Sequence, residues 1–363
     1  MSVAAPPVAL SPRRRARSFL WSCVSTPVNA ALSLAIVLAL LYWVPGLIAW
    51  ALVEARWSGP PAGCHDAAGA CWSFVGRRWP LILYGGYPEG ERWRVDLLFA
   101  LVLVAGALLL SRRVTHKGVI GLLLIVAVPP LTALLLLGGV AGLTYVPTTR
   151  WGGLMLTVAL GGAALAGSLP VGLALALCRR SHLPVIRGFA VALIEFLRGV
   201  PLVPLLFLAM TVLPLFLPPG SDPSPLLRAV VAFILFNGAA MAEVFRGGLQ
   251  AIPKGQFEAA RGLGLSPART MALVILPQAI AIVTPGLLNV AVAIVKETTV
   301  ILIIGLYDFF NEIVAGLADP QWLQGGAEVL NTGYVFAGLV YWAVCFGLSR
   351  VSARLELAKE RRA

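Results

Sequence analysis

Two pairs of oppositely charged residues stand at the edges of long apolar stretches. Glu195 and Arg198 open one such stretch, and the same Glu-x-x-Arg-Gly pattern recurs where another stretch closes at Glu243 and Arg246. Residues three apart lie one helical turn apart, so each acid and base can neutralise one another and lower the cost of placing charge near hydrocarbon. The pattern predicts either a structural belt of charge at one membrane depth or a gate in which the pairing changes.

Lys296 and Glu297 form a third charged pair, and they follow 25 uncharged residues that begin at Met271. A charged pair at this depth predicts a functional site by default, because charge inside a bilayer is costly. A zwitterionic solute would match both signs, but structural pairing of the two residues explains them as well. Asn237 and Asn289 are further polar groups inside apolar stretches, where substrate contact and hydrogen bonding between helices are both open interpretations.

Motifs for catalysis are absent from the sequence. No phosphate-binding loop of the form G-x-x-x-x-G-K-[ST] occurs, so the chain cannot hydrolyse ATP by that machinery. The chain has three His, and it has no Ser/His/Asp, H-E-x-x-H or cysteine-cluster pattern. We therefore expect no catalytic residue, no metal site and no cofactor bound by this chain itself.

The elements that carry these residues are apolar segments long enough to cross a bilayer. Of the 363 residues 59% are hydrophobic and 12% are charged, and the mean hydropathy is +0.88, which excludes a soluble domain of this length. Uncharged or nearly uncharged stretches predict eight spans, at 29–53, 95–111, 118–143, 151–178, 199–219, 226–242, 271–295 and 329–349. The predicted fold class is an all-α polytopic membrane protein with about eight transmembrane helices.

The distribution of basic residues predicts the orientation. With the N-terminus inside, 19 Lys and Arg residues fall in cytosolic segments, beginning with the cluster from Arg13 to Arg17, and seven fall outside. This bias predicts that both termini are cytoplasmic. The net charge of +12 arises from clusters between apolar runs, so we read it as a topology signal and expect lipid, and no nucleic acid, as a partner.

The long outer loop 54–94 contains two cysteines. Cys64 and Cys71 are seven positions apart in a stretch of Gly, Ala, His and Asp. In an oxidising periplasm they could close a small disulfide loop, and the alternative is two unpaired thiols. His65 and Asp66 stand beside them, but two Cys and one His without a fourth ligand do not predict a metal site.

The longest polar stretch of the second half runs from Glu243 to Gln278. Pro253 suits the first turn of a short helix that stops at Gly264 in the left-handed conformation. Ser266 and Pro267 then predict the N-cap and first turn of a second helix. On the first helix Phe257, Ala260, Arg261 and Gly264 share one side by their spacing, and another protein's groove could accept that side closely.

At these residues the sequence resembles the EAA loop of bacterial ABC importer permeases. Glu258-Ala259-Ala260 is followed after three residues by Gly264, and after nine more by Val274, Ile275, Leu276 and Pro277, with Val274 where Ile is usual. The resemblance implies a helix that couples the permease to a cytosolic ATPase. The implied coupling residues are Gln256, Phe257, Glu258, Ala259, Ala260, Arg261, Gly264, Leu276 and Pro277.

Two further segments resemble permeases for polar amino acids. One runs from Glu195 to Leu202, and the other contains Lys296-Glu297-Thr298-Thr299. The overall pattern is most similar to the larger permease subunit of the general L-amino acid importers of Gram-negative bacteria. The resemblance implies an inner-membrane subunit for L-amino acid uptake that works with an ABC ATPase dimer, which binds the ATP, a second, related permease and a periplasmic amino-acid-binding protein.

These considerations predict the domain organisation. We expect a cytosolic tail (1–28), an accessory three-helix region (29–150), a five-helix permease core (151–357) with a cytosolic coupling loop (246–271), and a second tail (358–363). The predicted substrate path or gate contains Glu195, Arg198, Glu243, Arg246, Asn237, Asn289, Lys296 and Glu297. The alternative function is a proton-coupled secondary transporter of a small polar solute, which would need isolated titratable carboxylates at mid-membrane and no docking loop.

Overall fold

A computed structural model describes residues 21–65, 67–111, 114, 117–218, 220 and 223–360. The basic cluster Arg13 to Arg17, most of the predicted tail 1–28, Asp66 and the last three residues therefore lie outside the described residues. Within the described part the chain is built of helices, and its β-type pairing is limited to isolated bridges. The all-α class predicted from the long apolar stretches is confirmed.

The helices divide into two compact units, each of which we describe by itself. The first unit ends at Gly76 and also includes Pro320–Thr332. It contains α2 (Pro27–Ile48), η1 (Ala49–Val53), η2 (Pro61–Cys64), the start of α3 (Trp72–Tyr84), α14 (Pro320–Leu323) and the first turns of α15 (Gly326–Glu360). Helix α2 is apolar on all sides and buries none of its residues within the chain, which is typical of a membrane span.

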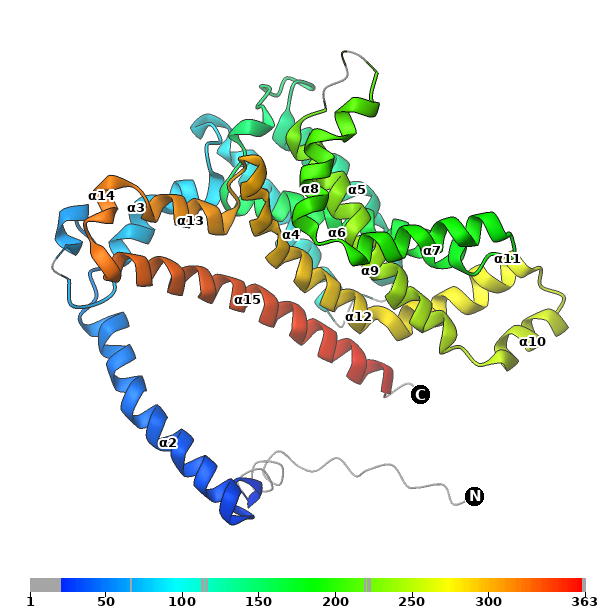
Figure 1. Cartoon of the computed structure of the whole chain (residues 1–363), viewed down its shortest axis with the longest axis horizontal. Helices are drawn as coiled ribbons and strands as arrows, with labels where there is room; N and C mark the ends of the chain where they lie inside the picture. Colours follow the sequence, from blue (N-terminus) through cyan, green and yellow to red (C-terminus); the bar gives the residue numbers. More distant parts are fainter. Residues whose placement is uncertain are drawn as a thin grey trace. The chain divides into compact units, whose positions relative to one another are not determined.

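The second unit comprises Arg77–Asp319 and the chain from Gly333 onward. Its helices before the 246–271 loop are η3 (Glu89–Glu91), α4 (Arg92–Leu110), α5 (Lys117–Leu137), η4 (Thr148–Arg150), α6 (Gly153–Arg179), α7 (Pro184–Gly199), α8 (Leu202–Thr211), η5 (Leu213–Phe216) and α9 (Pro225–Gln250). They are followed by α10 (Lys254–Gly262), α11 (Pro267–Arg269), η6 (Thr270–Ile275), α12 (Leu276–Glu297), η7 (Thr298–Ile304), α13 (Phe309–Leu317) and the rest of α15. Helices α10 and α11 lie where α9 ends and α12 begins (Figure 1).

Six helices of the described residues are long and apolar enough to cross a membrane, and they coincide with six of the eight predicted spans. The predicted span 95–111 is helical as α4, which has Arg92, Arg94 and Asp96 in its first two turns and is not among the six. The predicted span 199–219 is not one helix, because it contains α8 and the short η5, and α8 is joined to α7 at a bend of 109°. Pro201 explains the break, since proline disfavours helical geometry at the residue before it.

Close packing of α6 against α9 forms the centre of the second unit. A Cβ atom added at Gly172 of α6 would lie 2.6 Å from Cβ of Met241 and 2.9 Å from the carbonyl oxygen of Gly238, both on α9. The hydroxyl of Ser168 donates a hydrogen bond to the Ile234 carbonyl at 3.2 Å. Small residues and side-chain hydroxyls are what allow two helices to approach closely in lipid. The small residues of α6 therefore allow this close crossing with α9.

Candidate functional site

Helix α10 ends through local backbone geometry. Gly264 adopts the left-handed conformation at φ +76°, as the sequence predicted. The amide of Leu265 donates to the carbonyl of Ala260 at 3.1 Å, and the amide of Gly264 donates to that of Arg261 at 2.9 Å. This pair of bonds is the Schellman arrangement, which satisfies the last carbonyls of a helix and needs a residue that tolerates positive φ. The helix therefore stops at a defined point.

The second helix of the hairpin also starts as predicted. The Ser266 hydroxyl accepts a hydrogen bond from the Arg269 amide at 3.4 Å, and Pro267 lies in the first turn. At the other end of the loop Pro253 was expected in the first turn of α10. It is instead the N-cap residue, just before the helix begins at Lys254. Pro277 directly follows the π-helical turn η6, inside the continuous helical segment Pro267–Ile304.

The orientation of α10 differs from the prediction. Ala260 is 2% exposed, and Phe257 is half-buried with its ring 5.9 Å from the guanidinium carbon of Arg180 at the end of α6. These two residues therefore pack on the chain's own helices, whereas Arg261 and Gly264, which the prediction placed on the same side, are exposed. An amphipathic helix uses its apolar side first to attach to its own domain.

The outward side of α10 is formed by exposed residues, namely Gln256, Glu258, Ala259, Arg261 and, just after the helix, Leu263. Leu263 is 81% exposed and was not among the predicted coupling residues. Gln256 accepts a hydrogen bond from the Gln278 side chain at 3.1 Å, which ties α10 to α12. The exposed side thus combines both signs of charge with one large apolar side chain.

Five charged residues at the ends of α6, α7 and α9 form what we call the ion-pair cluster: Arg179, Glu195, Arg198, Glu243 and Arg246. Glu243 is its centre. Its carboxylate accepts from Arg246 at 2.7 and 2.9 Å and from Arg179 at 2.5 Å, and Arg198 lies 3.9 Å away. Arg179 also contacts the Glu195 carboxylate at 3.4 Å. One carboxylate therefore faces three arginines from three helices.

Only one of the two predicted pairs forms within its own helix. Glu243 and Arg246 pair as expected, whereas Glu195 pairs with Arg179 and Arg198 with Glu243. The prediction of two equivalent local pairs is wrong, because α6 brings a third arginine between the other two helices. Sequence reasoning missed Arg179, although its position at the end of a predicted span was a signal.

Asn237 and Glu297 form a polar contact between α9 and α12. Asn237 is 2% exposed, and its amide donates to the Glu297 carboxylate at 3.1 Å and to the Phe233 carbonyl at 3.2 Å. Glu297 is half-buried, whereas Lys296 is exposed, so the predicted pairing of these neighbours does not describe the structure. Adjacent helical residues do not face one another. Asn289, on the same helix, is exposed.

A second buried polar centre was not predicted. Asp308 is fully buried, and its carboxylate accepts from the Asn311 amide at 3.0 Å, from the Thr298 hydroxyl at 2.9 Å and from the Tyr341 hydroxyl at 3.3 Å. Burial raises the pKa of Asp308, and these hydrogen bonds oppose the rise. Burial also raises the pKa of Glu312, one turn further along α13, to about 7. Two carboxyl groups therefore lie at the start of α13: the buried Asp308 at its N-cap and the half-buried Glu312 in its first turn.

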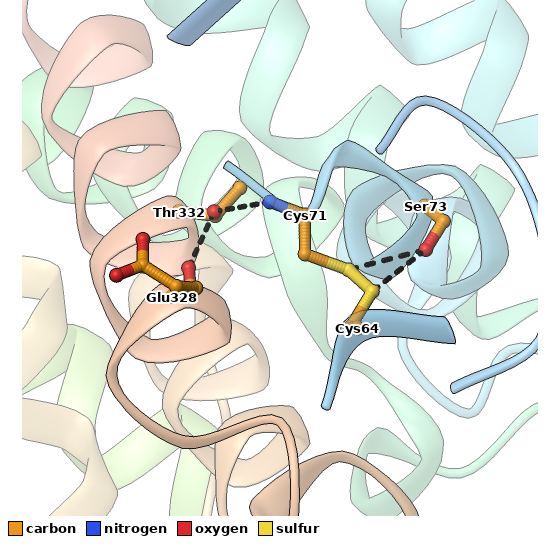
Figure 2. Close-up of a disulfide and its surroundings, with 5 residues drawn as sticks. All are labelled: Cys64, Cys71, Ser73, Glu328 and Thr332. Atoms are coloured by element: carbon orange, nitrogen blue, oxygen red, sulfur yellow. Dashed lines mark hydrogen bonds between the residues drawn. A yellow bond between two sulfur atoms is a disulfide. The ribbon is translucent and has the colours of Figure 1, made fainter. Parts of the chain in front are cut away.

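The structure joins Cys64 and Cys71 in a disulfide, with Cα atoms 5.9 Å apart (Figure 2). The hydroxyl of Ser73 lies 3.3 and 3.2 Å from the two sulfurs. The amide of Cys71 donates to the Thr332 hydroxyl at 2.8 Å, which in turn donates to the Glu328 carbonyl at 2.6 Å. The loop is thereby attached to the first turns of α15. Among the described residues no three His, Cys, Asp or Glu side chains gather as metal ligands would.

Known proteins resemble the chain along most of its length. It is 42% identical over 343 residues to the inner membrane amino-acid ABC transporter permease protein YhdY of Escherichia coli, covering 94% of this chain and 92% of that protein. It is 31% identical over 412 aligned residues to the glutamate/glutamine/aspartate/asparagine transport system permease protein BztC of Rhodobacter capsulatus, covering 93% and 92%.

A solved structure of an amino acid ABC transporter with histidines is 30% identical and covers 57% of this chain and 91% of that chain, with a TM-score of 0.48. Residues 168–360 match the family described as binding-protein-dependent transport system inner membrane component. The match and the identity to YhdY, together with the six apolar helices, show that this chain is a multi-pass membrane protein that belongs to that family of ABC transporter permeases.

Proposed function

We propose that the chain is the permease subunit of an ATP-driven importer that takes up L-amino acids from the periplasm. The 42% identity to an amino-acid permease over nearly the whole chain supports the substrate class. The observation that carries the proposal is the 246–271 loop, in which a short helix with a defined end turns charged and apolar side chains outward. A protein that transports alone has no need of such a surface.

The outward side of α10 is the part that would enter a groove of the ATPase. Leu263 offers an apolar anchor, and Glu258 and Arg261 offer charges that can select the partner's register. The buried side, with Phe257 and Ala260, fastens the helix to the spans, so that force on α10 moves them as well. ATP bound by the ATPase dimer would then drive alternating access through rigid-body movement of the helices.

The substrate path is proposed to run beside α9 and α12. The Glu297 carboxylate, held by Asn237, is suited to an ammonium group, and Lys296 and Asn289 are exposed on the same helix. The ion-pair cluster is proposed as a gate, since its members come from three helices. A second, related permease would complete the path, and a periplasmic binding protein would deliver the amino acid.

The orientation and the domain boundaries stay proposals. We place both termini and the 246–271 loop in the cytosol, and the permease core at 151–357. A reporter that is active only in the cytosol should be active after Ala363 and silent when inserted near Ala67. The reverse pattern would overturn the orientation.

Purification of the complex tests the function. We expect the chain to copurify with an ABC ATPase and a second permease, and the complex in proteoliposomes to accumulate L-amino acids when ATP and a binding protein are supplied on the appropriate sides. Uptake without ATP would contradict the proposal.

One observation favours the rival function. Glu297 is half-buried and its hydrogen-bond partner is the neutral amide of Asn237, as expected of a proton-binding carboxylate in a secondary transporter. That function predicts uptake by the chain alone, driven by a proton gradient and abolished in Glu297→Gln. Uptake that needs both ATP and the ATPase would exclude it.

A further inference from the structure

Two adjacent arginines at the end of α6 contact two different parts of the molecule. Arg179, the last residue of α6, contacts Glu195 on α7 and Glu243 on α9 at 3.4 and 2.5 Å. Arg180, the C-cap residue, has its guanidinium carbon 5.9 Å from the centre of the Phe257 ring on α10. The same guanidinium donates to the Leu249 carbonyl in the last turn of α9 at 3.3 Å.

Several physical features make the end of α6 suitable for linking α10 to the ion-pair cluster. Neighbouring residues at a helix end point in different directions, so two guanidinium groups reach separate targets from one short stretch of backbone. The unpaired carbonyls at a helix C-terminus favour positive charge. Arginine presents a flat group with several donors, which can lie over an aromatic ring or bridge two carboxylates. Lysine presents a compact ammonium group without this flat, forked arrangement of donors.

Besides its contact with Arg180, α10 is attached by two short connecting segments, by the buried Ala260 and by the hydrogen bond between Gln256 and Gln278 of α12. Residues 251–253 join it to α9, and residues 263–266 join it to α11. The contact of Phe257 with Arg180 gives α10 a lateral attachment to α6, one residue away from the arginine that bridges α7 and α9. A displacement of α10 that moves Arg180 therefore also moves the neighbouring Arg179, which pairs with the carboxylates of Glu195 and Glu243.

We propose that Arg179 and Arg180 are positioning residues that transmit movement of α10 to the ion-pair cluster. The inference rests on the proposed function, because it assumes that an ATPase moves α10. Neither residue needs to touch the amino acid. Their role is to make the pairing within the cluster depend on the position of α10.

The test measures coupling, which is the number of amino acids taken up per ATP hydrolysed by the full reconstituted complex. Arg180→Ala should leave the ATPase attached but lower this ratio on the order of tenfold, within the range that coupling residues reach. Arg179→Gln should also lower it, and Arg179→Lys should restore part of the loss. The control is Arg187→Ala, because Arg187 is exposed on α7 and makes no side-chain contact that the described structure records. This control should keep the ratio of the unsubstituted complex.

A double-mutant cycle locates the effect. If Arg180 acts through the Phe257 ring, Arg180→Ala combined with Phe257→Leu should be no worse than the more severe single variant. Additive losses, or an unchanged ratio in Arg180→Ala with normal membrane abundance, would overturn the inference. The proposed function would fail separately, if the unsubstituted complex took up no amino acid at the expense of ATP.

Discussion

The 246–271 loop and the ion-pair cluster are stabilised by different kinds of interaction. The end of α10 is defined by backbone hydrogen bonds around Gly264, between residues no more than five apart, and the start of α11 is capped by the Ser266 hydroxyl. The cluster is defined by side chains from three helices, with Glu243 as the shared acceptor. A locally defined element keeps its shape when it moves, whereas a cluster spread over several helices changes when they move relative to one another. The 246–271 loop is therefore suited to transmit a movement, and the ion-pair cluster is suited to change its pairing when the helices move.

The largest expected effect on transport comes from breaking the local geometry of the 246–271 loop. Gly264→Val places a β-branched residue at φ +76°, which costs roughly 1 to 2 kcal/mol and favours continuation of the helix. A bias of that size changes populations by a factor of about 5 to 30. We expect normal membrane abundance, weaker retention of the ATPase and a loss of uptake, measured by copurification and by transport of labelled amino acid.

The matched control is Gly262→Val, two residues earlier in the same exposed element. An added Cβ at either glycine would meet open space, but only Gly264 has positive φ. The control should therefore transport nearly normally. Equal uptake by both variants at the level of the unsubstituted protein would remove Gly264 as the determinant.

The next effect is expected in the cluster. Glu243→Gln removes the charge that three arginines face, and we expect a loss of about 2 to 3 kcal/mol in the free energy of unfolding, as for hydrogen bonds to charged groups. Glu195→Gln is the control, because this side chain is 57% exposed and its one recorded ion pair is at 3.4 Å. It should change stability by less than about 1 kcal/mol. Thermal unfolding in detergent measures both, and equal effects would contradict the central place of Glu243.

The loop closed by Cys64 and Cys71 is held by a disulfide between near neighbours in the sequence and by a hydrogen bond to the distant Thr332. It therefore combines the local kind of interaction with the kind that joins distant segments. Replacing both Cys64 and Cys71 by Ser should destabilise the loop by about 2 kcal/mol, since a short closed loop loses less entropy than a long one. Faster proteolysis of the loop would report the change. In native membranes without reductant neither thiol should react with maleimide, and full labelling of both would show that the bond is absent.

The last prediction concerns Glu312, a half-buried carboxyl group outside the ion-pair cluster. Because burial raises the pKa of Glu312 from 4.5 to about 7, the folded state binds more protons than the unfolded state between these values. The free energy of unfolding should therefore fall as pH rises from about 4.5 to about 7. Nearby Arg78 lowers the pKa and Asp308 raises it, so both belong to the same titration. Glu312→Gln should flatten the dependence of melting temperature on pH, and an unchanged slope would refute the assignment.

The membrane class, six of the spans and the hairpin around Gly264 and Ser266 were predictable from the sequence. Each depends on short-range physics: the length of an apolar run, the left-handed tolerance of glycine, or the capping ability of serine. No knowledge of distant neighbours is needed for any of them. The same reasoning placed Cys64 and Cys71 close enough to bond, because they are near in sequence.

Only the tertiary structure decided which side of α10 faces outward and which arginine neutralises which carboxylate. Spacing of three residues permits Glu195 to pair with Arg198, but Arg179 arrives from α6 and takes that place. Likewise the side of α10 that contains Phe257 is apolar enough for either a partner or the chain's own helices, and the end of α6 settles the choice. Such outcomes depend on which side chains from distant parts of the sequence compete for the same partner. A local sequence pattern contains no information about those distant side chains.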